Sequence, residues 1–194
     1  MDFETKLEQY ARLAVCAGVN LQPGQELLVS APIDCAVLVR KIVRQAYAVG
    51  AKDVTVQWSD EAITRMRYDA CPVDRFEHAA EWIQVLQNGH AKRGGAILSI
   101  TAGNPDALAG VDPQKISAWI KAVHRDCKEF YDGMNLGYNT WSIIGASSPA
   151  WAQKVFPGAS EEDAVNNGTL SSILANIFPS KYLAISTVSS LPYP

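Results

Sequence analysis

The sequence lacks the features of a nucleic-acid-binding or membrane-spanning protein. Its 194 residues carry 17 basic and 20 acidic side chains, which gives a net charge of −3, and no basic block is interleaved with aromatic residues. A low-charge stretch at residues 166–194 is interrupted by Asn176, Pro179 and Lys181, whereas a spanning helix needs about 20 mostly apolar residues. We therefore expect neither a nucleic-acid partner nor a membrane partner.

Paired cysteine motifs are absent too. None of the four cysteines belongs to a CxxC motif or stands at zinc-ligand spacing from a histidine. The first residues, MDFETKLEQY, are acidic and amphipathic rather than basic and then apolar, so they do not resemble a signal peptide. We expect a cytoplasmic protein with free, buried or half-buried thiols at Cys16, Cys35, Cys71 and Cys127.

Histidine and carboxylate patterns do not predict a catalytic or metal site. There is no HExxH motif, and no histidine has a second histidine four residues away. We expect His78, His90 and His124 to be solvated or helix-capping. Asp74 and Glu77 stand near a predicted helix start, where compensation of the helix dipole explains them better than acid–base chemistry.

The sequence contains apolar runs that alternate between strand and helix character. Leu27–Val29 is a short continuous apolar run, as in a strand buried on both faces, and Val39, Ile42 and Ala46 recur at helical spacing. Strand, helix and strand in succession form a βαβ unit with parallel strands. The predicted strands are 26–32, 53–58, 95–101 and 140–146, and the predicted helices are 3–17, 35–49, 59–68, 72–88, 110–130 and 147–156.

This alternation predicts a layered α/β fold with a mainly parallel sheet flanked by helices. Several helix ends carry local signals. They are Gly18 as a left-handed residue ending the first helix, Asp34 as the cap of the second, Gly50 at its end, Ser59 or Asp60 as the next cap, and Asp112 with Pro113 at the start of the 110–130 helix.

Small polar residues lie at or near the end of each predicted strand. Parallel α/β sheets bind ligands beyond the carboxyl ends of their strands, so these residues are candidates for the rim of a substrate pocket. The same residue types are favoured in caps and turns, and this structural explanation stays open beside the functional one. The candidate rim residues are Ser30, Ser59, Thr101, Asn104 and Ser147.

The sequence contains neither a nucleophile elbow nor a phosphate-binding loop. In GASSP, Pro149 stands where a nucleophile elbow needs a second glycine. Gly94 and Gly95 precede a strand instead of joining a strand to a helix, and TAGNP lacks the Lys-Ser/Thr of a Walker loop. A nucleotide-binding α/β domain is thereby disfavoured, and we assign neither a catalytic residue nor a metal ligand.

Four segments resemble a known family when read in order. They are KLEQYARLAVCAGVNLQPGQELLVSAPID (6–34), AYAVGAKDVTVQWSDE (46–61), GAILSITAGNPDALAGVDPQKIS (95–117) and NTWSIIGASSPAWAQKVFPGASEEDAV (139–165). Together they resemble the N-terminal domain of the thermophilic metalloaminopeptidases of the aminopeptidase T and aminopeptidase S type. The chain departs from the family pattern at Ala146-Ser147, where only one proline follows.

The resemblance implies an enzyme that removes N-terminal residues from peptides with two divalent metal ions, of the zinc or cobalt kind. It also implies a homodimer. The family's metal ligands and catalytic groups lie in its C-terminal half, and none of them can be carried over to a residue here. As a metalloaminopeptidase, the chain is therefore expected to be truncated and inactive by itself.

The last 29 residues differ from the rest of the chain, since Lys181 is their single charged side chain. We predict an N-terminal α/β domain over 1–165 and an atypical tail over 166–194. Either the reading frame changes near Asn166, or the chain is a short variant whose YLAISTV segment adds a strand. The alternative to an aminopeptidase domain is a stand-alone α/β domain that binds a small ligand or a peptide.

Overall fold

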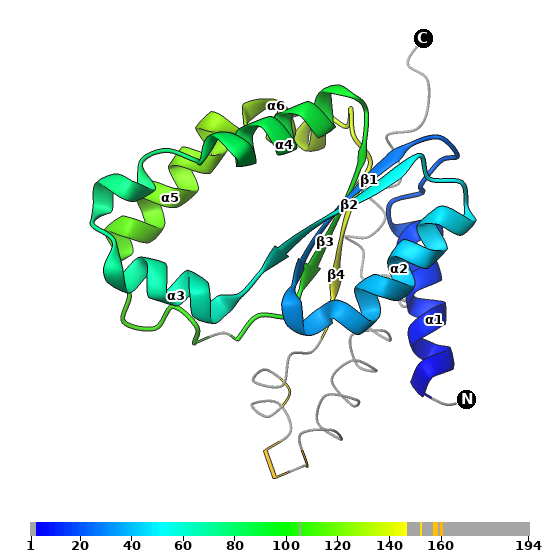
Figure 1. Cartoon of the computed structure of the whole chain (residues 1–194), viewed down its shortest axis with the longest axis horizontal. Coiled ribbons are helices and arrows are strands. Elements are labelled where there is room, and N and C mark those ends of the chain that lie inside the picture. Colours follow the sequence, from blue (N-terminus) through cyan, green and yellow to red (C-terminus); the bar gives the residue numbers. More distant parts are fainter. Residues whose placement is uncertain (1–2, 105, 147–151, 153–156, 159, 161–194) are drawn as a thin grey trace.

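The protein, seen in a computed structural model that describes residues 3–104, 106–146, 152, 157–158 and 160, contains a four-stranded sheet. The strand order is β2-β1-β3-β4, and all three strand pairs are parallel (Figure 1). The predicted α/β class with a parallel sheet is confirmed. The strands are β1 (Glu26–Pro32), β2 (Asp53–Ser59), β3 (Ala96–Thr101) and β4 (Trp141–Gly145).

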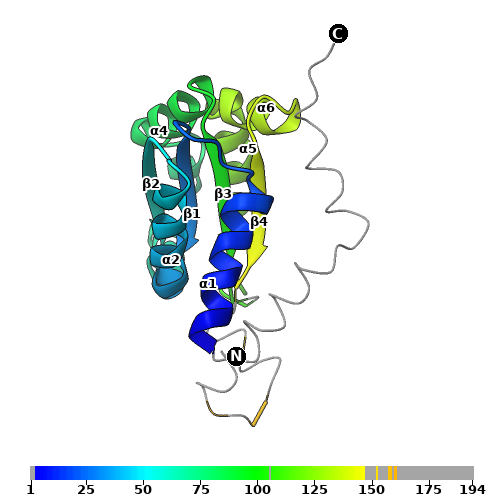
Figure 2. The same cartoon turned by 90° about the vertical axis from the view of Figure 1, so that its right-hand side faces the viewer.

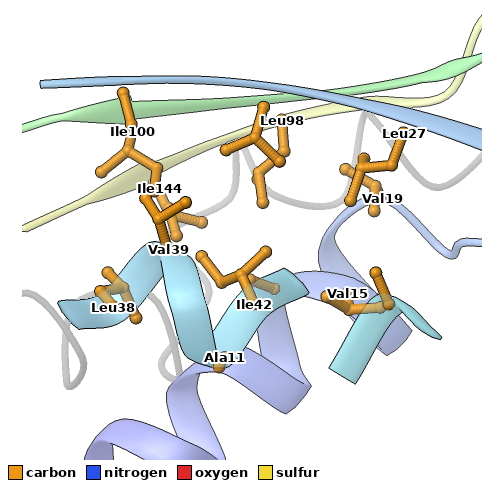
Figure 3. Close-up of a cluster of buried hydrophobic side chains, with 14 of the residues drawn as sticks. Ala11, Val15, Val19, Leu27, Leu38, Val39, Ile42, Leu98, Ile100 and Ile144 are labelled. Atoms are coloured by element: carbon orange, nitrogen blue, oxygen red, sulfur yellow. The ribbon is translucent and has the colours of Figure 1, made fainter. Parts of the chain in front are cut away.

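One face of the sheet is covered by α1 (Phe3–Leu13) and α2 (Ala36–Ala48), which stand in front of the strands in Figure 2. Alternation along the strands sends Leu27, Leu98 and Ile144 to this face, where they meet Val15 and Ile42 from the helical layer (Figure 3). Ile42 is fully buried. Burying a side chain of this size stabilises the fold by about 1.5–3 kcal/mol, so this layer is the main core.

The opposite face is covered by α4 (Glu81–Lys92) and α6 (Lys128–Asn135). Leu28 and Ile97 point to this side and pack with Cys127 and Phe130. Farther from the sheet, α3 (Glu61–Ala70) and α5 (Pro113–Asp126) share a separate cluster in which Tyr68 stacks on Phe76 at 4.7 Å between ring centroids. Figure 1 shows this second helical layer extending beyond the strands.

The first helix ends differently from the prediction. It continues into a π-helical turn, η1 (Ala14–Gly18), and the left-handed residue is Asn20 with φ 47°, so the prediction for Gly18 is wrong. A Cβ atom on Gly18 would lie 3.2 Å from Ser142 Oγ, so its glycine permits close approach to β4. Asp34 is not the cap of α2 either, because it lies inside the short helix η2 (Ile33–Cys35).

Two predicted helices are each divided in the structure. The 72–88 segment forms a short helix, η3 (Val73–Phe76), and then α4, which runs to Lys92. The division falls where the Ala79 backbone N–H donates to Asp126 Oδ2 at 2.9 Å instead of to a helical carbonyl. The 110–130 segment divides at the fully buried Cys127, whose φ of −108° and ψ of 39° redirect the chain into α6. Long-range contacts thus override local periodicity.

Other local predictions are confirmed. Asp60 caps α3 by accepting from Ile63 N at 3.1 Å, and Asp112 caps α5 with Pro113 at the first position. Gly50, with φ 91°, follows the end of α2. The predicted 147–156 helix and the 166–194 tail lie outside the described residues. None of the helices described here is long and apolar enough to cross a membrane.

His90 is buried rather than solvated or capping, so its prediction is wrong. Its side chain is 3% exposed, and Nε2 lies 2.8 Å from the carbonyl oxygen of Ala96, which requires the proton on Nε2. Burial lowers the pKa of this imidazole, and the hydrogen bond to Ala96 opposes that shift only in part. His78 and His124 are exposed, as expected.

The cysteine prediction holds in three of four positions. All four thiols are free, with Cys35 and Cys127 buried and Cys71 half-buried. Cys16 is exposed, although it lies in the same π-helical turn as the buried Ala14 and Val15. Burial raises the pKa of Cys35 to about 11, so this thiol stays protonated and unreactive near neutral pH.

Candidate functional site

The carboxyl ends of all four strands lie along one edge of the sheet, at the lower end in Figure 1. Ser30 lies in β1, Ser59 and Thr101 end β2 and β3, and Asn104 follows β3 in a loop. Alternation puts Ser30, Ser59 and Thr101 on the face opposite α1 and α2. The structure thus brings three candidates to one side of the sheet, while Ser147 lies outside the described residues.

Two of the candidate residues already make structural hydrogen bonds, one between two strands and one within a turn. Thr101 Oγ1 donates to the Ile144 carbonyl at 3.3 Å, which ties β3 to β4. Asn104 Oδ1 accepts from Asp106 N at 3.0 Å and closes a turn. Both side chains therefore make hydrogen bonds that stabilise the fold, whether or not a ligand binds.

Ser30 belongs to a polar row that crosses three strands. The strand register pairs it with Gln57 on one side and with Ser99 on the other. Gln57 Oε1 is buried and has no hydrogen-bond partner in the part of the chain that the structure describes. These hydroxyl and amide groups can orient a polar ligand, but they are neither acids nor bases near neutral pH.

Glu61 also belongs to this edge, and the sequence patterns did not single it out. It lies in the first turn of α3, and its Oε1 accepts the backbone N–H of Asn104 at 2.9 Å. A Cβ atom on Gly103 would lie 2.8 Å from the same oxygen, so the glycine leaves room for the carboxylate. Neither Glu61 nor Gln57 could be found from a search for residues that directly follow apolar runs.

A separate groove of about 550 Å³ lies along α5, on the second helical layer. Its lining includes His78, Lys121 and Arg125. Arg125 Nη2 donates to the Glu77 carbonyl at 2.7 Å and approaches His78 Nδ1 at 3.0 Å. The hydrogen bond from Arg125 and the bond from Ala79 N hold the pKa of Asp126 below its usual range. The positive charge of Arg125, in the wall of the groove, is thus neutralised by the Asp126 carboxylate.

The described residues do not form a metal site. No group of three or more His, Cys, Asp or Glu side chains among them is arranged to hold a metal ion. Catalytic zinc sites use about three such ligands from the protein. The side chains described here therefore do not fit the metal ions that the family resemblance implies.

The sequence profile of the thermophilic metalloprotease (M29) family matches residues 3–176. The chain belongs to this M29 family. It is 41% identical over 164 residues to aminopeptidase AmpS of Bacillus subtilis and 34% identical over 163 residues to aminopeptidase T of Thermus thermophilus. Each alignment covers 84% of this chain and 40% of the relative, so the chain spans about 40% of the length of these M29 relatives.

The solved structure of wild-type AmpT from Thermus thermophilus has the same M29 fold. It superposes with a TM-score of 0.81 at 32% sequence identity, over 90% of this chain and 44% of that chain. The suspected family is therefore confirmed together with the α/β class. Membership of M29 also means that the chain comes from a family of metal-dependent hydrolases.

Proposed function

We propose that this chain serves as the α/β domain of a metal-dependent aminopeptidase, which removes N-terminal residues from peptides. The observation that carries the proposal is the M29 match over residues 3–176, supported by the names of the aminopeptidase relatives. The described residues supply the framework and the polar strand-end edge. The metal ligands and the catalytic groups lie outside the described residues.

The expected cofactor is a pair of divalent ions, of the zinc or cobalt kind. The expected substrate is a peptide, and the strand-end edge is its candidate contact surface in this domain. Ser30, Ser59, Thr101, Asn104 and Ser147 remain the proposed contact residues, and the polar row adds Gln57 and Ser99. Hydroxyl and amide groups at this edge would position the peptide rather than react with it.

A domain replacement tests the proposal. In this experiment, the chain replaces the aligned segment of Bacillus subtilis AmpS, and release of N-terminal residues is followed with Zn²⁺ or Co²⁺ present. The chimaera is expected to be active and to lose activity with a chelator, because the same fold should support the same catalytic half. Intact AmpS and AmpS without that segment are the positive and negative controls.

Calorimetric titration of the chain itself with Zn²⁺ or Co²⁺ tests the proposal that the metal ligands lie outside the described residues. We expect no tight dinuclear binding, because the described residues contain no suitable ligand cluster. Stoichiometric binding of two ions would show that the assignment of the ligands is wrong. A folded, metal-loaded chimaera without activity would contradict the aminopeptidase assignment instead.

The proposal also includes the localisation, the oligomeric state, the partners and the domain division of the chain. We place the chain in the cytoplasm, since four free thiols suit a reducing compartment. We also propose a homodimer, and no nucleic-acid or membrane partner, on account of the net charge of −3 and the absence of a basic block. The division of the chain at residue 165 belongs with these proposals.

One observation favours the alternative of a stand-alone binding domain. The unpartnered Gln57 Oε1 lies in the polar row beside Ser30, as in a site that awaits a hydrogen-bond donor. A thermal-shift screen of the full chain with peptides and phosphorylated metabolites tests this alternative. A shift that is lost in Ser30→Ala but kept in Ser117→Ala would support it, and no shift with any compound would contradict it.

A further inference from the structure

β2 is an edge strand without the usual protection against pairing. Among the strands that the structure describes, it lies at the outer edge of the sheet in Figure 2, next to β1 on one side only. Its seven residues, DVTVQWS, contain no proline and no lysine, and Asp53 is their single charge. Natural edge strands are commonly protected by lysine, proline or a bulge, because unpaired backbone groups invite another strand.

The other edge of the sheet differs in these respects. β4 has five residues, and η1 lies close to it, since a Cβ atom on Gly18 would lie 3.2 Å from Ser142 Oγ. The Tyr10 hydroxyl also donates to the Gly145 carbonyl at 2.7 Å. β2 is therefore the longer edge, and the one without a neighbouring turn against it among the described residues.

We infer that β2 pairs antiparallel with β2 of a second copy of this chain, about a two-fold axis at Val56. The two sheets would then join into one sheet of eight strands. This inference rests on the homodimer proposed above, but it does not depend on aminopeptidase activity. A two-fold axis requires a strand that is complementary to itself, and the order of residues in β2 meets this condition.

The register centred on Val56 pairs apolar residues with each other on one face of the strand and polar residues with each other on the opposite face. Val54 meets the partner subunit's Trp58 on the face of α2, and Trp58 is 44% exposed in the single chain. Aromatic and β-branched residues make favourable cross-strand pairs. On the opposite face, Thr55 meets the partner subunit's Gln57. All these pairs follow from the two-residue period of a strand and the position of the axis.

The distribution of charge supports the same register. Lys52, just before β2, stands opposite the partner subunit's Asp60, just after it, so each end of the paired strands joins opposite charges. Moving the axis to Gln57 would put Asp53 opposite the partner subunit's Glu61, which is repulsive.

Two double variants that differ at one position test the pairing. Thr55→Lys with Gln57→Lys brings like charges together in both cross-strand pairs, and we expect it to raise the dimer dissociation constant at least about tenfold. Thr55→Lys with Gln57→Glu brings opposite charges together, so it should form dimers as the unchanged chain does. Light scattering and sedimentation of the full chain measure the oligomeric state, and circular dichroism checks that each variant folds.

Hydrogen exchange tests the same pairing in the unchanged chain. Hydrogen exchange of the full chain at two concentrations about a hundredfold apart should show stronger protection of 53–59 at the higher concentration, because dimers form by mass action. A chain that stays monomeric would overturn both this inference and the homodimer. Dimers that both double variants leave unchanged, with no added protection of 53–59, would overturn the β2 pairing and leave the homodimer standing. Neither result bears on the metal and chimaera tests.

Discussion

The backbone N–H of Asn104 donates a 2.9 Å hydrogen bond to Glu61 Oε1, which ties the loop after β3 to the first turn of α3. The two residues are 43 positions apart in the sequence. Asp60, the neighbour of Glu61, caps the same helix, so cap and tie are adjacent. This contact sets the shape of the strand-end edge where the candidate peptide contacts lie.

Removal of the Glu61 carboxylate should loosen the loop after β3. Glu61→Ala is expected to lower the free energy of unfolding by about 1 kcal/mol, because Asn104 N loses its acceptor. Faster hydrogen exchange at residues 103–106 should accompany the loss. Glu61→Gln keeps a side-chain oxygen acceptor and serves as the matched control. Equal exchange in the two variants would show that the hydrogen bond does not hold the loop.

Acid should destabilise the protein through His90. Burial lowers the pKa of this imidazole in the folded protein below its usual value of about 6.5, so the unfolded chain binds the proton more strongly. The free energy of unfolding should therefore fall as the pH drops below about 6.5, and the loss should be complete once the pH passes below the folded pKa. Urea unfolding at a series of pH values measures this slope.

Two variants separate His90 from the other titrating groups. His90→Gln keeps a donor for the Ala96 carbonyl but cannot titrate, so the slope that begins below about pH 6.5 should disappear. His124→Gln, at an exposed site, retains His90 and should retain the slope. A slope that survives His90→Gln would assign the acid sensitivity to other residues.

Asn139 should contribute strongly to stability, because it is 2% exposed and its amide nitrogen donates to two carbonyls. The acceptors are Gly95 at 2.9 Å and Ala91 at 3.1 Å. Asn139→Ala leaves both buried oxygens without these donors, and we expect it to lower the free energy of unfolding by about 2 kcal/mol. Urea unfolding followed by tryptophan fluorescence measures the change.

The control for Asn139 is Asn135→Ala, at an exposed position near the end of α6. Its free energy of unfolding should stay within about 0.5 kcal/mol of the unchanged chain. Asn139→Asp should be at least as harmful as Asn139→Ala, because a buried carboxylate would face two carbonyl oxygens. Comparable losses at Asn135 and Asn139 would contradict the role of burial.

The placement of the candidate residues in the fold was predicted in part. Strand-end reasoning selected Ser30, Ser59 and Thr101, and the parallel sheet places all three at one edge and on one face. It missed Gln57 and Glu61, since the first lies inside a strand and the second inside a helix. Their relation to the edge depends on strand register and on a contact across 43 residues, neither of which has a local signal.

Local sequence determined the class of fold and several element ends. The apolar run Leu27–Val29 predicts a strand buried on both faces, and hydrophobic periods predict the helices around it, because burial of apolar surface selects these spacings. Asp60 and Asp112 cap helices through bonds to residues two or three positions away. Such signals act within one turn, so they survive in any fold that contains the segment.

Tertiary structure alone decided where long-range bonds compete with local ones. The Asp126 carboxylate accepts a hydrogen bond from the backbone N–H of Ala79. The helix that hydrophobic periodicity predicts over 72–88 is divided at this point. Asn139 is buried where its amide nitrogen donates to the carbonyls of Ala91 and Gly95, 48 and 44 positions away. These outcomes depend on which segments meet in space, and a pattern of neighbouring residues does not contain that information.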